Sequence, residues 1–256
     1  MSTTRLHCER AGYGPALLLL HGIGSNRRAF RHQVAAFADA FTMLAWDAPG
    51  YGLSEDPVTP FSLEDLADDA ARLLDEQGIE RAHVLGVSLG GVIAQLVYLR
   101  YAARVASLIL VDTTPGGGAV AEPERSKRVQ QRLDAIDQLG PREMARRRAP
   151  QLVRADAPLG LVQELEDIMA EVRPAGYRSA AIALGATDLT ARLGDIRAPT
   201  LVVHGEDDRV VPLETGRALA EAIPGARLAV IEQAGHVSNQ EQPAVFNAIV
   251  REFLTQ

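Results

Sequence analysis

The chain has 256 residues, a net charge of −7, 47% hydrophobic residues and 23% charged residues. This composition is that of an ordinary folded protein, and it excludes a disordered chain, a collagen-like fibre and a long coiled coil. The negative charge gives no electrostatic reason to bind nucleic acid. The length suits either one α/β domain with an insertion or two small domains.

The N-terminal region predicts neither a membrane span nor a signal peptide. Its longest apolar run, residues 16–20, is too short to cross a bilayer, and residues 1–14 contain no apolar signal core. We therefore expect a cytoplasmic protein without membrane contact. The single cysteine, Cys8, can form neither an internal disulfide nor a thiolate metal cluster, and we expect no metal and no cofactor. The sequence leaves open whether the chain forms a homo-oligomer.

Strands and helices alternate along most of the chain. An alternating segment at residues 3–9 and a turn at residues 11–14 predict a hairpin that leads into a buried strand at residues 16–20. The other predicted elements are the strands 41–46, 82–87, 105–111, 200–204 and 226–231 and the helices 62–76, 89–101, 213–223 and 244–254. Because each crossover lays a helix on a sheet face, this order implies parallel pairing. We predict an α/β fold with a mostly parallel, doubly wound sheet of about eight strands.

Residues 115–195 interrupt this alternation. From about residue 113 to residue 195 no strand-like run occurs, and apolar residues recur at helical spacing instead. Three consecutive glycines, residues 116–118, provide a flexible entry to this part. We predict that residues 1–114 and 196–256 form an α/β core and that residues 115–195 form a helical cap inserted in it.

A Gly-x-Ser-x-Gly pattern, residues 86–90, joins the predicted strand 82–87 to the helix that follows. A nucleophile elbow needs this context, because its serine occupies a strained turn and glycines let the flanking chain pass close by. A chain of this composition would contain the pattern by chance about 0.07 times. Ser88 is therefore the candidate nucleophile, at a helix N-terminus where developing negative charge is favoured.

A serine hydroxyl needs a neighbouring base, and the chain has six histidines that could supply it. His236 follows the predicted strand 226–231, on a loop at the carboxyl edge of the sheet where the elbow also lies. His21 and His204 precede glycines at strand ends, where we expect them to brace loops by hydrogen bonding. The histidines that stand in no motif are His7, His32 and His83. His236 is therefore the candidate base.

The base needs a carboxylate to orient it, and three aspartates are placed to do so. Asp207 and Asp208 follow the predicted strand 200–204, and Asp112 stands at the end of the strand 105–111. These positions alone do not decide between the three.

The intermediate of acyl transfer carries an oxyanion, which needs two N–H donors. One is expected from the backbone of Leu89, directly after the nucleophile. The other is expected from Ile23, because Gly22 and Gly24 on either side of it let the backbone turn its amide toward the site. This loop lacks the Gly-Lys-Ser/Thr ending of a P-loop, so it does not predict a phosphate site.

Five segments resemble, in chain order, the successive signatures of the α/β-hydrolase superfamily: residues 20–24, 46–54, 86–91, 205–208 and 234–239. With Glu241 and Pro243 after it, the last segment is similar to the 3-oxoadipate enol-lactonase-like branch. The resemblance implies the α/β-hydrolase fold and a triad in the order Ser, Asp, His. It selects Asp208 as the acid by its position in the motif.

Departures from sister families narrow the chemistry that this resemblance implies. Haloalkane dehalogenases and epoxide hydrolases of the fold use an Asp nucleophile, whereas position 88 is Ser. Meta-cleavage C–C hydrolases usually have Trp after the catalytic histidine, whereas Val237 follows here, which weakens that alternative but leaves it open. Cofactor-free haloperoxidases share the triad, so perhydrolysis is a further alternative. A ligand-binding receptor on a hydrolase scaffold is the non-enzymatic alternative, and an intact triad argues against it.

Substrate choice is expected to reside in the cap, about which the sequence says less. Arg147, in the basic run 146–148, could hold a substrate carboxylate by its bidentate fork, although such runs are more often solvated helix faces. Phe30, Trp46 and Tyr51 are candidate pocket residues, although aromatic residues beside buried strands more often belong to the core.

We therefore predict a serine hydrolase that cleaves a small carboxylic ester or lactone through an acyl-enzyme at Ser88. Its expected partner is this small molecule, with no nucleic acid and no membrane. Because Ser88 precedes the insertion while Asp208 and His236 follow it, the site closes only if both flanking segments form one domain.

Overall fold

The computed structural model describes residues 4–256, which form a seven-stranded sheet in the order β1-β3-β2-β4-β5-β6-β7. Every neighbouring pair is parallel except β1 with β3, which is antiparallel. The strands are β1 (His7–Ala11), β2 (Ala16–Leu20), β3 (Thr42–Asp47), β4 (Ala82–Val87), β5 (Val105–Val111), β6 (Thr200–Gly205) and β7 (Arg227–Ile231). The predicted doubly wound α/β fold is thus confirmed.

The predicted number of strands and the predicted pairing of the first strand need correction. We predicted about eight strands, whereas the described residues form seven. We also predicted a hairpin of the first two strands, but β1 pairs with β3, with His7 opposite Asp47. The hairpin cannot form because β3 and β4 already occupy both edges of β2. Thr3, where we expected the first strand to begin, lies outside the described residues.

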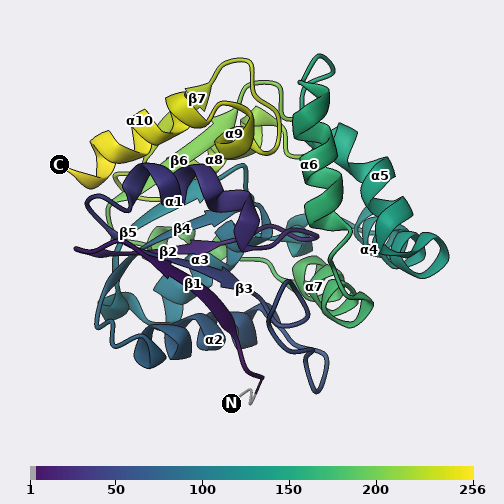
Figure 1. Ribbon diagram of the computed structural model, residues 1–256, viewed down its shortest axis with the longest axis horizontal. Coiled ribbons are helices and arrows are strands. Elements are labelled where there is room, and N and C mark those ends of the chain that lie inside the picture. The colour runs from purple at the N-terminus through teal and green to yellow at the C-terminus, as the bar shows by residue number, and fades with distance from the viewer. Residues whose placement is uncertain (1–3) are drawn as a thin grey trace.

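The apolar run of β2 serves both faces of the sheet, because successive side chains of a strand point to opposite sides. Leu17 and Leu19 face one core, and Leu18 and Leu20 face the other, all without exposed surface. The first core is covered by α1 (Arg31–Phe37) and α10 (Pro243–Leu254), and the second by α2 (Leu63–Glu76), α3 (Leu89–Arg100) and α8 (Leu213–Ala222). Figure 1 shows α1 and α10 above the sheet and α2 below it.

A helical insert lies between β5 and β6, as predicted for this part of the chain. It consists of α4 (Glu124–Asp134), the π-helical segment η4 (Ala135–Leu139), α5 (Gly140–Leu152), α6 (Leu159–Met169) and α7 (Pro174–Ala186). Figure 1 shows it as a separate group of helices to the right of the sheet. The division of the chain into core and cap domains at residues 115 and 195 stays a prediction.

Polar contacts join the insert to the loops that follow β2 and β3. Glu171, after α6, accepts hydrogen bonds from Asn26 Nδ2 at 2.9 Å and from Arg28 Nη1 at 2.5 Å. Arg173, directly before α7, donates from Nη1 to the carbonyl oxygen of Gly52 at 2.8 Å. These contacts hold the insert over one end of the sheet.

No helix within residues 4–256 is long and apolar enough to cross a membrane.

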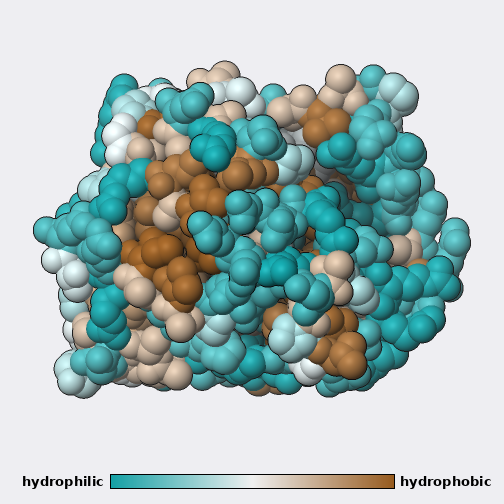
Figure 2. Space-filling view, turned by 90° about the horizontal axis from the view of Figure 1, so that it is seen from above, coloured by the Kyte–Doolittle hydropathy of each residue, from teal (hydrophilic) through white to brown (hydrophobic). Residues whose placement is uncertain are grey.

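Figure 2 shows mostly hydrophilic residues over the insert, whereas apolar residues gather on the side of α1 and α10. Val245 on α10 is 48% exposed.

Candidate active site

Ser88 occupies a strained turn between β4 and α3. Its φ of 53° and ψ of −115° lie in a region that residues with a Cβ rarely adopt. The backbone N–H of Ser88 donates to the Val111 carbonyl at 2.9 Å, and its carbonyl accepts from Thr113 Oγ1 at 2.6 Å. Hydrogen bonds from the Ser88 backbone to β5 and the residues after it therefore hold the turn, and none of them involves Oγ.

Close backbone approaches explain the glycines on both sides of this turn. A Cβ on Gly86 would lie 2.1 Å from the Gly90 carbonyl oxygen, and a Cβ on Gly90 would lie 2.0 Å from that of Leu20. In the facing loop, a Cβ on Gly22 would lie 3.3 Å from the Cβ of Ser88. The elbow is therefore packed tightly against the end of β2 and the loop after it.

We expect Gly86→Ala to lower the free energy of unfolding by about 2 kcal/mol or more, because its methyl group would overlap a backbone oxygen that cannot move without shifting the elbow. Gly160→Ala is the matched control, since nothing lies within 4 Å of a Cβ at this exposed position of α6. The better helix propensity of alanine should leave its stability unchanged or raise it by up to about 1 kcal/mol. Denaturant unfolding measures both, and equal stabilities would contradict the packing role of Gly86.

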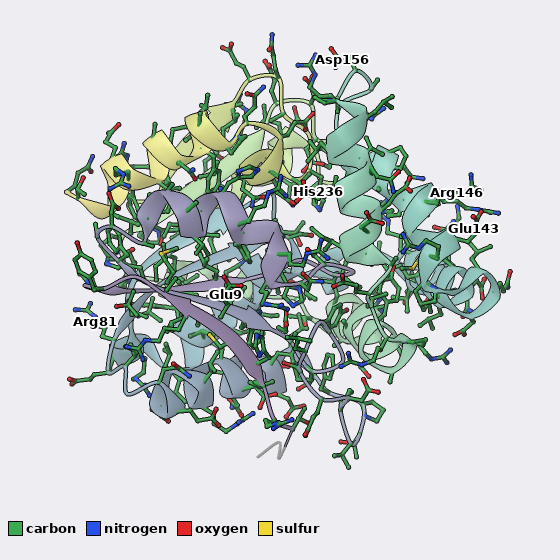
Figure 3. All side chains as sticks on the ribbon, in the orientation of Figure 1. Glu9, Arg81, Glu143, Arg146, Asp156 and His236 are labelled. Atoms are coloured by element: carbon green, nitrogen blue, oxygen red, sulfur yellow. The ribbon has the colours of Figure 1, made fainter. Side chains whose placement is uncertain are left out.

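Three side chains from distant parts of the sequence meet at the elbow. Ser88 Oγ lies 3.0 Å from His236 Nε2, and His236 Nδ1 lies 2.8 Å from Asp208 Oδ2. Asp208 is 7% exposed and His236 is 5% exposed, so both are shielded from bulk water. Figure 3 shows His236 between the sheet and the helical insert. The distances suit a nucleophile, a base and an acid that orients the base.

Backbone donors turn the Asp208 carboxylate toward His236. Asp208 Oδ1 accepts from the N–H groups of Val210 at 2.7 Å and Val211 at 2.9 Å. Oδ2 is left to accept from Nδ1 of the imidazole, which puts the ring proton on Nδ1 in the neutral base. Nε2 can then accept the proton of Ser88, as a general base must.

The two alternative aspartates do not touch the imidazole. Asp207 has a half-exposed side chain. Asp112 is fully buried, and its carboxylate accepts from the N–H of Gly205 at 2.8 Å, from the N–H of Ser238 at 3.0 Å and from the hydroxyl of Ser238 at 2.7 Å. Burial raises the pKa of Asp112 to about 7. Asp112 therefore ties the end of β6 to the loop that carries His236.

His21 and His204 brace loops, as we predicted. The N–H of Ala48 donates to His21 Nε2 at 3.1 Å, and His21 Nδ1 lies 2.9 Å from the Gly22 carbonyl oxygen. His204 Nε2 lies 2.9 Å from the carbonyl oxygen of Val211. Burial lowers the pKa of His21, which favours the neutral ring that this pattern of hydrogen bonds requires.

Ligand atoms of Asp112, His204 and Asp208 lie within 4.8 Å of one another, a spacing that could suit a metal ion. Both carboxylates already accept hydrogen bonds, Asp208 from His236 and Asp112 from Ser238. A metal at this place would therefore compete with the hydrogen bonds that orient the base. The expectation of no metal and no cofactor stays a prediction.

Leu89 directly follows Ser88, and Ile23 lines the same cavity as Ser88. Leu89 is the first residue of α3, so its N–H has no partner within the helix. Among residues 4–256, neither amide N–H has a hydrogen-bond acceptor. Both amides are therefore available to an oxyanion, and their role stays a proposal.

A cavity of about 640 Å³ opens beside Ser88 and His236. This volume is typical of small-ligand pockets, which measure about 300 to 1,000 Å³. The loop after β2, the helical insert and the loop that carries His236 supply its walls. Phe30 and Arg147, two of the predicted pocket residues, line it.

The prediction for Trp46 was wrong, because this side chain does not line the cavity. Trp46 is fully buried in the core between the sheet and α2, on the same face of β3 as Leu44. Tyr51 is also buried in this core, with its ring centroid 5.0 Å from that of His21. The aromatic residue that does line the cavity, besides Phe30, is Tyr177 of α7.

Among the described residues, no Asp and no Glu lines the cavity. Five arginines line it: Arg128, Arg132, Arg147, Arg148 and Arg209. Two of these arginines have carboxylate partners. Arg128 pairs with Glu124 at 3.0 Å, and Arg147 pairs with Glu143 at 2.7 Å. The side chains of the cavity wall therefore carry more positive than negative charge, which favours an anionic ligand.

Arg132 and Arg148 line the cavity, and neither has a carboxylate partner in the described part of the chain. Arg148 donates to Gln151 Oε1 at 2.7 Å, and within residues 4–256 nothing forms a hydrogen bond or ion pair with the Arg132 guanidinium. Burial lowers the pKa of both side chains, and the charge of Arg132 lowers the pKa of Arg148 further. Arginine stays protonated in proteins, so two like charges stand close together, and within residues 4–256 neither is paired directly with a carboxylate. An anion in the cavity would relieve this repulsion.

The basic run 146–148 divides between two environments. Arg146 and Arg147 both pair with Glu143 at 2.7 Å. Arg147 and Arg148 line the cavity, whereas Arg146 does not. Figure 3 shows Glu143 and Arg146 at the outer edge of the insert, away from His236. Only part of this basic run therefore forms the solvated helix face that is usual for such runs.

A family model described as alpha/beta hydrolase fold matches residues 15–243. The 3-oxoadipate enol-lactonase 2 of Acinetobacter baylyi is 33% identical over 238 residues, which are 92% of this chain and 87% of that protein. A 2-hydroxy-6-oxononadienedioate/2-hydroxy-6-oxononatrienedioate hydrolase of Cupriavidus pinatubonensis is 32% identical over 269 residues, with 98% of this chain and 90% of the relative covered.

Among solved structures, a malate-bound thermophilic esterase from Thermogutta terrifontis superposes with a TM-score of 0.92 at 28% identity. The superposition covers 99% of this chain and 96% of the esterase. The names of these three similar proteins point to different bonds and substrates. Similarity alone therefore does not choose the substrate of this chain.

Proposed function

This chain belongs to the α/β-hydrolase family, and from that premise we propose that it is a serine hydrolase that cleaves a small, negatively charged carboxylic ester or lactone. One observation carries the proposal: the contacts of Ser88 with His236 and of His236 with Asp208 stand at the wall of a cavity lined by arginines. The contacts supply the nucleophile and its base. The arginines favour a substrate with a carboxylate.

The acylation step follows from this geometry. Ser88 Oγ attacks the substrate carbonyl while its proton passes to His236 Nε2, 3.0 Å away. The carbonyl oxygen becomes an oxyanion between the N–H groups of Ile23 and Leu89. When the intermediate collapses, the bond to the leaving oxygen breaks, and His236 returns the proton to that oxygen. An alcohol leaves, or for a lactone the hydroxyl end of the opened ring, and the acyl group stays on Ser88.

Deacylation repeats these steps with water. His236 takes a proton from a water molecule, whose oxygen attacks the acyl carbonyl and forms a second oxyanion. The bond to Ser88 Oγ then breaks, the serine recovers its proton from His236, and the carboxylic acid leaves. Asp208 stabilises the imidazolium that forms in both steps and keeps the ring proton on Nδ1.

We expect Arg132→Gln to lower the preference for an anionic substrate about 10- to 100-fold, which is the usual effect of losing one charge-assisted hydrogen bond. The measurement is the ratio of kcat/KM for monomethyl succinate to kcat/KM for dimethyl succinate. Arg142→Gln is the matched control, because this exposed arginine on α5 pairs with Asp167 outside the cavity. A ratio that stays at the wild-type value in Arg132→Gln contradicts the role of Arg132.

Cleavage of a carbon–carbon bond is the second candidate function, and the similarity to the dienedioate hydrolase favours it. A panel of an anionic ester, an anionic lactone and a ring-fission dienoate separates the two candidates. We expect kcat/KM for the ester or the lactone to exceed that for the dienoate at least about tenfold. A higher kcat/KM for the dienoate than for the ester and the lactone would favour C–C bond hydrolysis as the function.

Further expectations stay predictions alongside this proposal. Perhydrolysis needs only the same triad and an added peroxide, so it would be a side activity of the same site. A purely ligand-binding role does not explain why both contacts of the triad, Ser88 with His236 and His236 with Asp208, are made. A cytoplasmic location and possible self-association also stay predictions.

A further inference from the structure

A second cavity, of about 310 Å³, also reaches Ser88. The residues that line both cavities are Ser88, Arg128, Arg132, Val210 and Pro212. Leu89 lines only the second cavity, and Ile23 lines only the first. A carbonyl oxygen held between these two amides would therefore stand where the cavities meet.

Away from this junction, the second cavity is mainly apolar. Its apolar wall is formed by Leu89, Val92, Val129, Leu184, Val211 and Pro212. Two arginines in the wall are neutralised, Arg125 by Glu122 at 2.7 Å and Arg128 by Glu124 at 3.0 Å. The volume equals that of about ten water molecules, and an apolar wall gives water few hydrogen-bond partners. Such a space favours a nonpolar group over water.

We propose that the second cavity binds an apolar arm of the substrate, while an anionic arm lies in the first cavity near Arg132 and Arg148. This inference rests on the proposed function, because both arms extend from the carbonyl that Ser88 attacks. The substrate class is an ester with a carboxylate on one side of the scissile bond and an alkyl or aryl group on the other. A compact lactone carboxylate would leave the second cavity without a nonpolar group.

A series of monoesters tests the proposal with the wild-type protein. Alkyl hydrogen succinates from methyl to hexyl place the apolar arm on the alcohol side, and O-acyl glycolates from acetyl to hexanoyl place it on the acyl side. Each methylene that leaves water should raise kcat/KM about threefold, which gives about 200-fold over the five methylenes from methyl to hexyl. A rise of this size in either series supports the proposal. No rise in either series overturns it.

Two substitutions then locate the effect. Val129→Phe on α4 and Thr215→Phe on α8 fill the second cavity from different elements. For the series in which wild-type kcat/KM rises with chain length, we compare kcat/KM of the longest ester with kcat/KM of the shortest. This ratio should fall at least about tenfold in each variant. Val245→Phe, on the exposed side of α10, is the matched control.

The outcomes separate the two levels of the proposal. If one of the two variants fails to fold, the other variant tests the proposal. An unchanged ratio in a folded variant overturns the assignment of the apolar arm to this cavity. If wild-type protein hydrolyses the shortest esters without any dependence on chain length, this inference fails and the proposed function stands. If it hydrolyses no ester of either series, the proposed function fails.

A separate observation concerns the loop that carries His236. The backbone N–H of His236 donates to the carbonyl oxygen of Leu152, the last residue of α5, at 2.8 Å. A Cβ on Gly235 would lie 2.9 Å from the same oxygen, so glycine permits this close approach. The candidate base is therefore hydrogen-bonded directly to the helical insert.

Glu241 joins the same two segments a second time. Its Oε2 accepts from the N–H of Gly235 at 2.7 Å, and its Oε1 accepts from the N–H of Arg154 at 3.1 Å. Glu241 lines neither cavity. We infer that Glu241 is a positioning residue, which fixes the distance between the insert and the histidine loop and thereby keeps His236 in reach of Ser88.

The test separates positioning from stability. Glu241→Gln replaces one carboxylate oxygen by an N–H donor, so one of the two hydrogen bonds is lost. We expect kcat to fall about tenfold while KM for an anionic ester stays within about twofold. Glu232→Gln, an exposed residue between β7 and His236, is the matched control.

Gly235→Ala provides a second variant, because its methyl group would push the loop away from the Leu152 oxygen. We expect the same fall in kcat. A normal kcat in folded Glu241→Gln, whether or not its Tm is lower, would show that Glu241 only stabilises the fold and would overturn the inference.

Discussion

Ser88→Ala should lower kcat for an anionic ester by about 10⁴- to 10⁶-fold, because no oxygen remains to form the acyl-enzyme. The variant should nevertheless keep its fold. The hydrogen bonds that hold the strained turn involve the backbone N–H and carbonyl of Ser88, and alanine retains both. The residual rate would come from the oxyanion donors and from binding in the cavities.

Steady-state kinetics and thermal unfolding together measure this prediction. Ser126→Ala, on the exposed surface of α4, is the matched control and should keep the wild-type kcat. If Ser88→Ala retained more than about a tenth of the wild-type kcat, the nucleophile would have to be another group.

Asp208→Asn should lower kcat by about 10⁴-fold near neutral pH. Two N–H groups, those of Val210 and Val211, point at Oδ1, so the oxygen of an asparagine amide would take that position. The amide NH₂ would then face Nδ1 of His236 and force the ring proton onto Nε2. In this tautomer His236 cannot accept the proton of Ser88.

Asp112→Asn is the informative comparison for this second prediction. Three hydrogen bonds, from Gly205 and Ser238, end on the Asp112 carboxylate, and an amide cannot accept all of them. We expect a loss of about 1 to 3 kcal/mol in the free energy of unfolding and a kcat within about tenfold of wild type. If Asp112→Asn instead caused the 10⁴-fold loss and Asp208→Asn did not, the acid would have been assigned to the wrong residue.

The sequence predicts the parts of this molecule that depend on local patterns. The apolar run of β2 and the alternation of strands with helices indicate the sheet, because each helix must cover a sheet face. The glycines around Ser88 indicate the elbow, because only glycine tolerates contacts near 2 Å between a virtual Cβ and a backbone oxygen. The elbow pattern predicts Ser88, and the position of its loop predicts His236, whereas Asp208 was selected by the resemblance to the family motif.

Features that depend on long-range packing could not be predicted in this way. The antiparallel pairing of β1 with β3 depends on which edges of β2 are already occupied. Trp46 looks like a pocket residue at the end of a strand, and only the packing of α2 shows that it belongs to the core.

Arg132 shows the same limit at the candidate site. In the sequence it is one charged residue on an amphipathic helix, where most charges are solvated. Only the arrangement of the insert shows that Arg132 faces a cavity next to Arg148, with no ion-pair partner among residues 4–256. Substrate recognition depends on such placements, so the sequence indicates the hydrolase family more readily than the substrate.

The most direct test of the account is the reaction of the protein with a fluorophosphonate probe, followed by mass spectrometry of the intact chain and its peptides. Ser88 Oγ should attack phosphorus, form a phosphorus–oxygen bond and release fluoride, with His236 accepting the proton. We predict one adduct per chain, on the peptide that contains Ser88, and no adduct on Ser88→Ala. A wild-type protein without an adduct, or an adduct that persists on Ser88→Ala, would contradict the central claim.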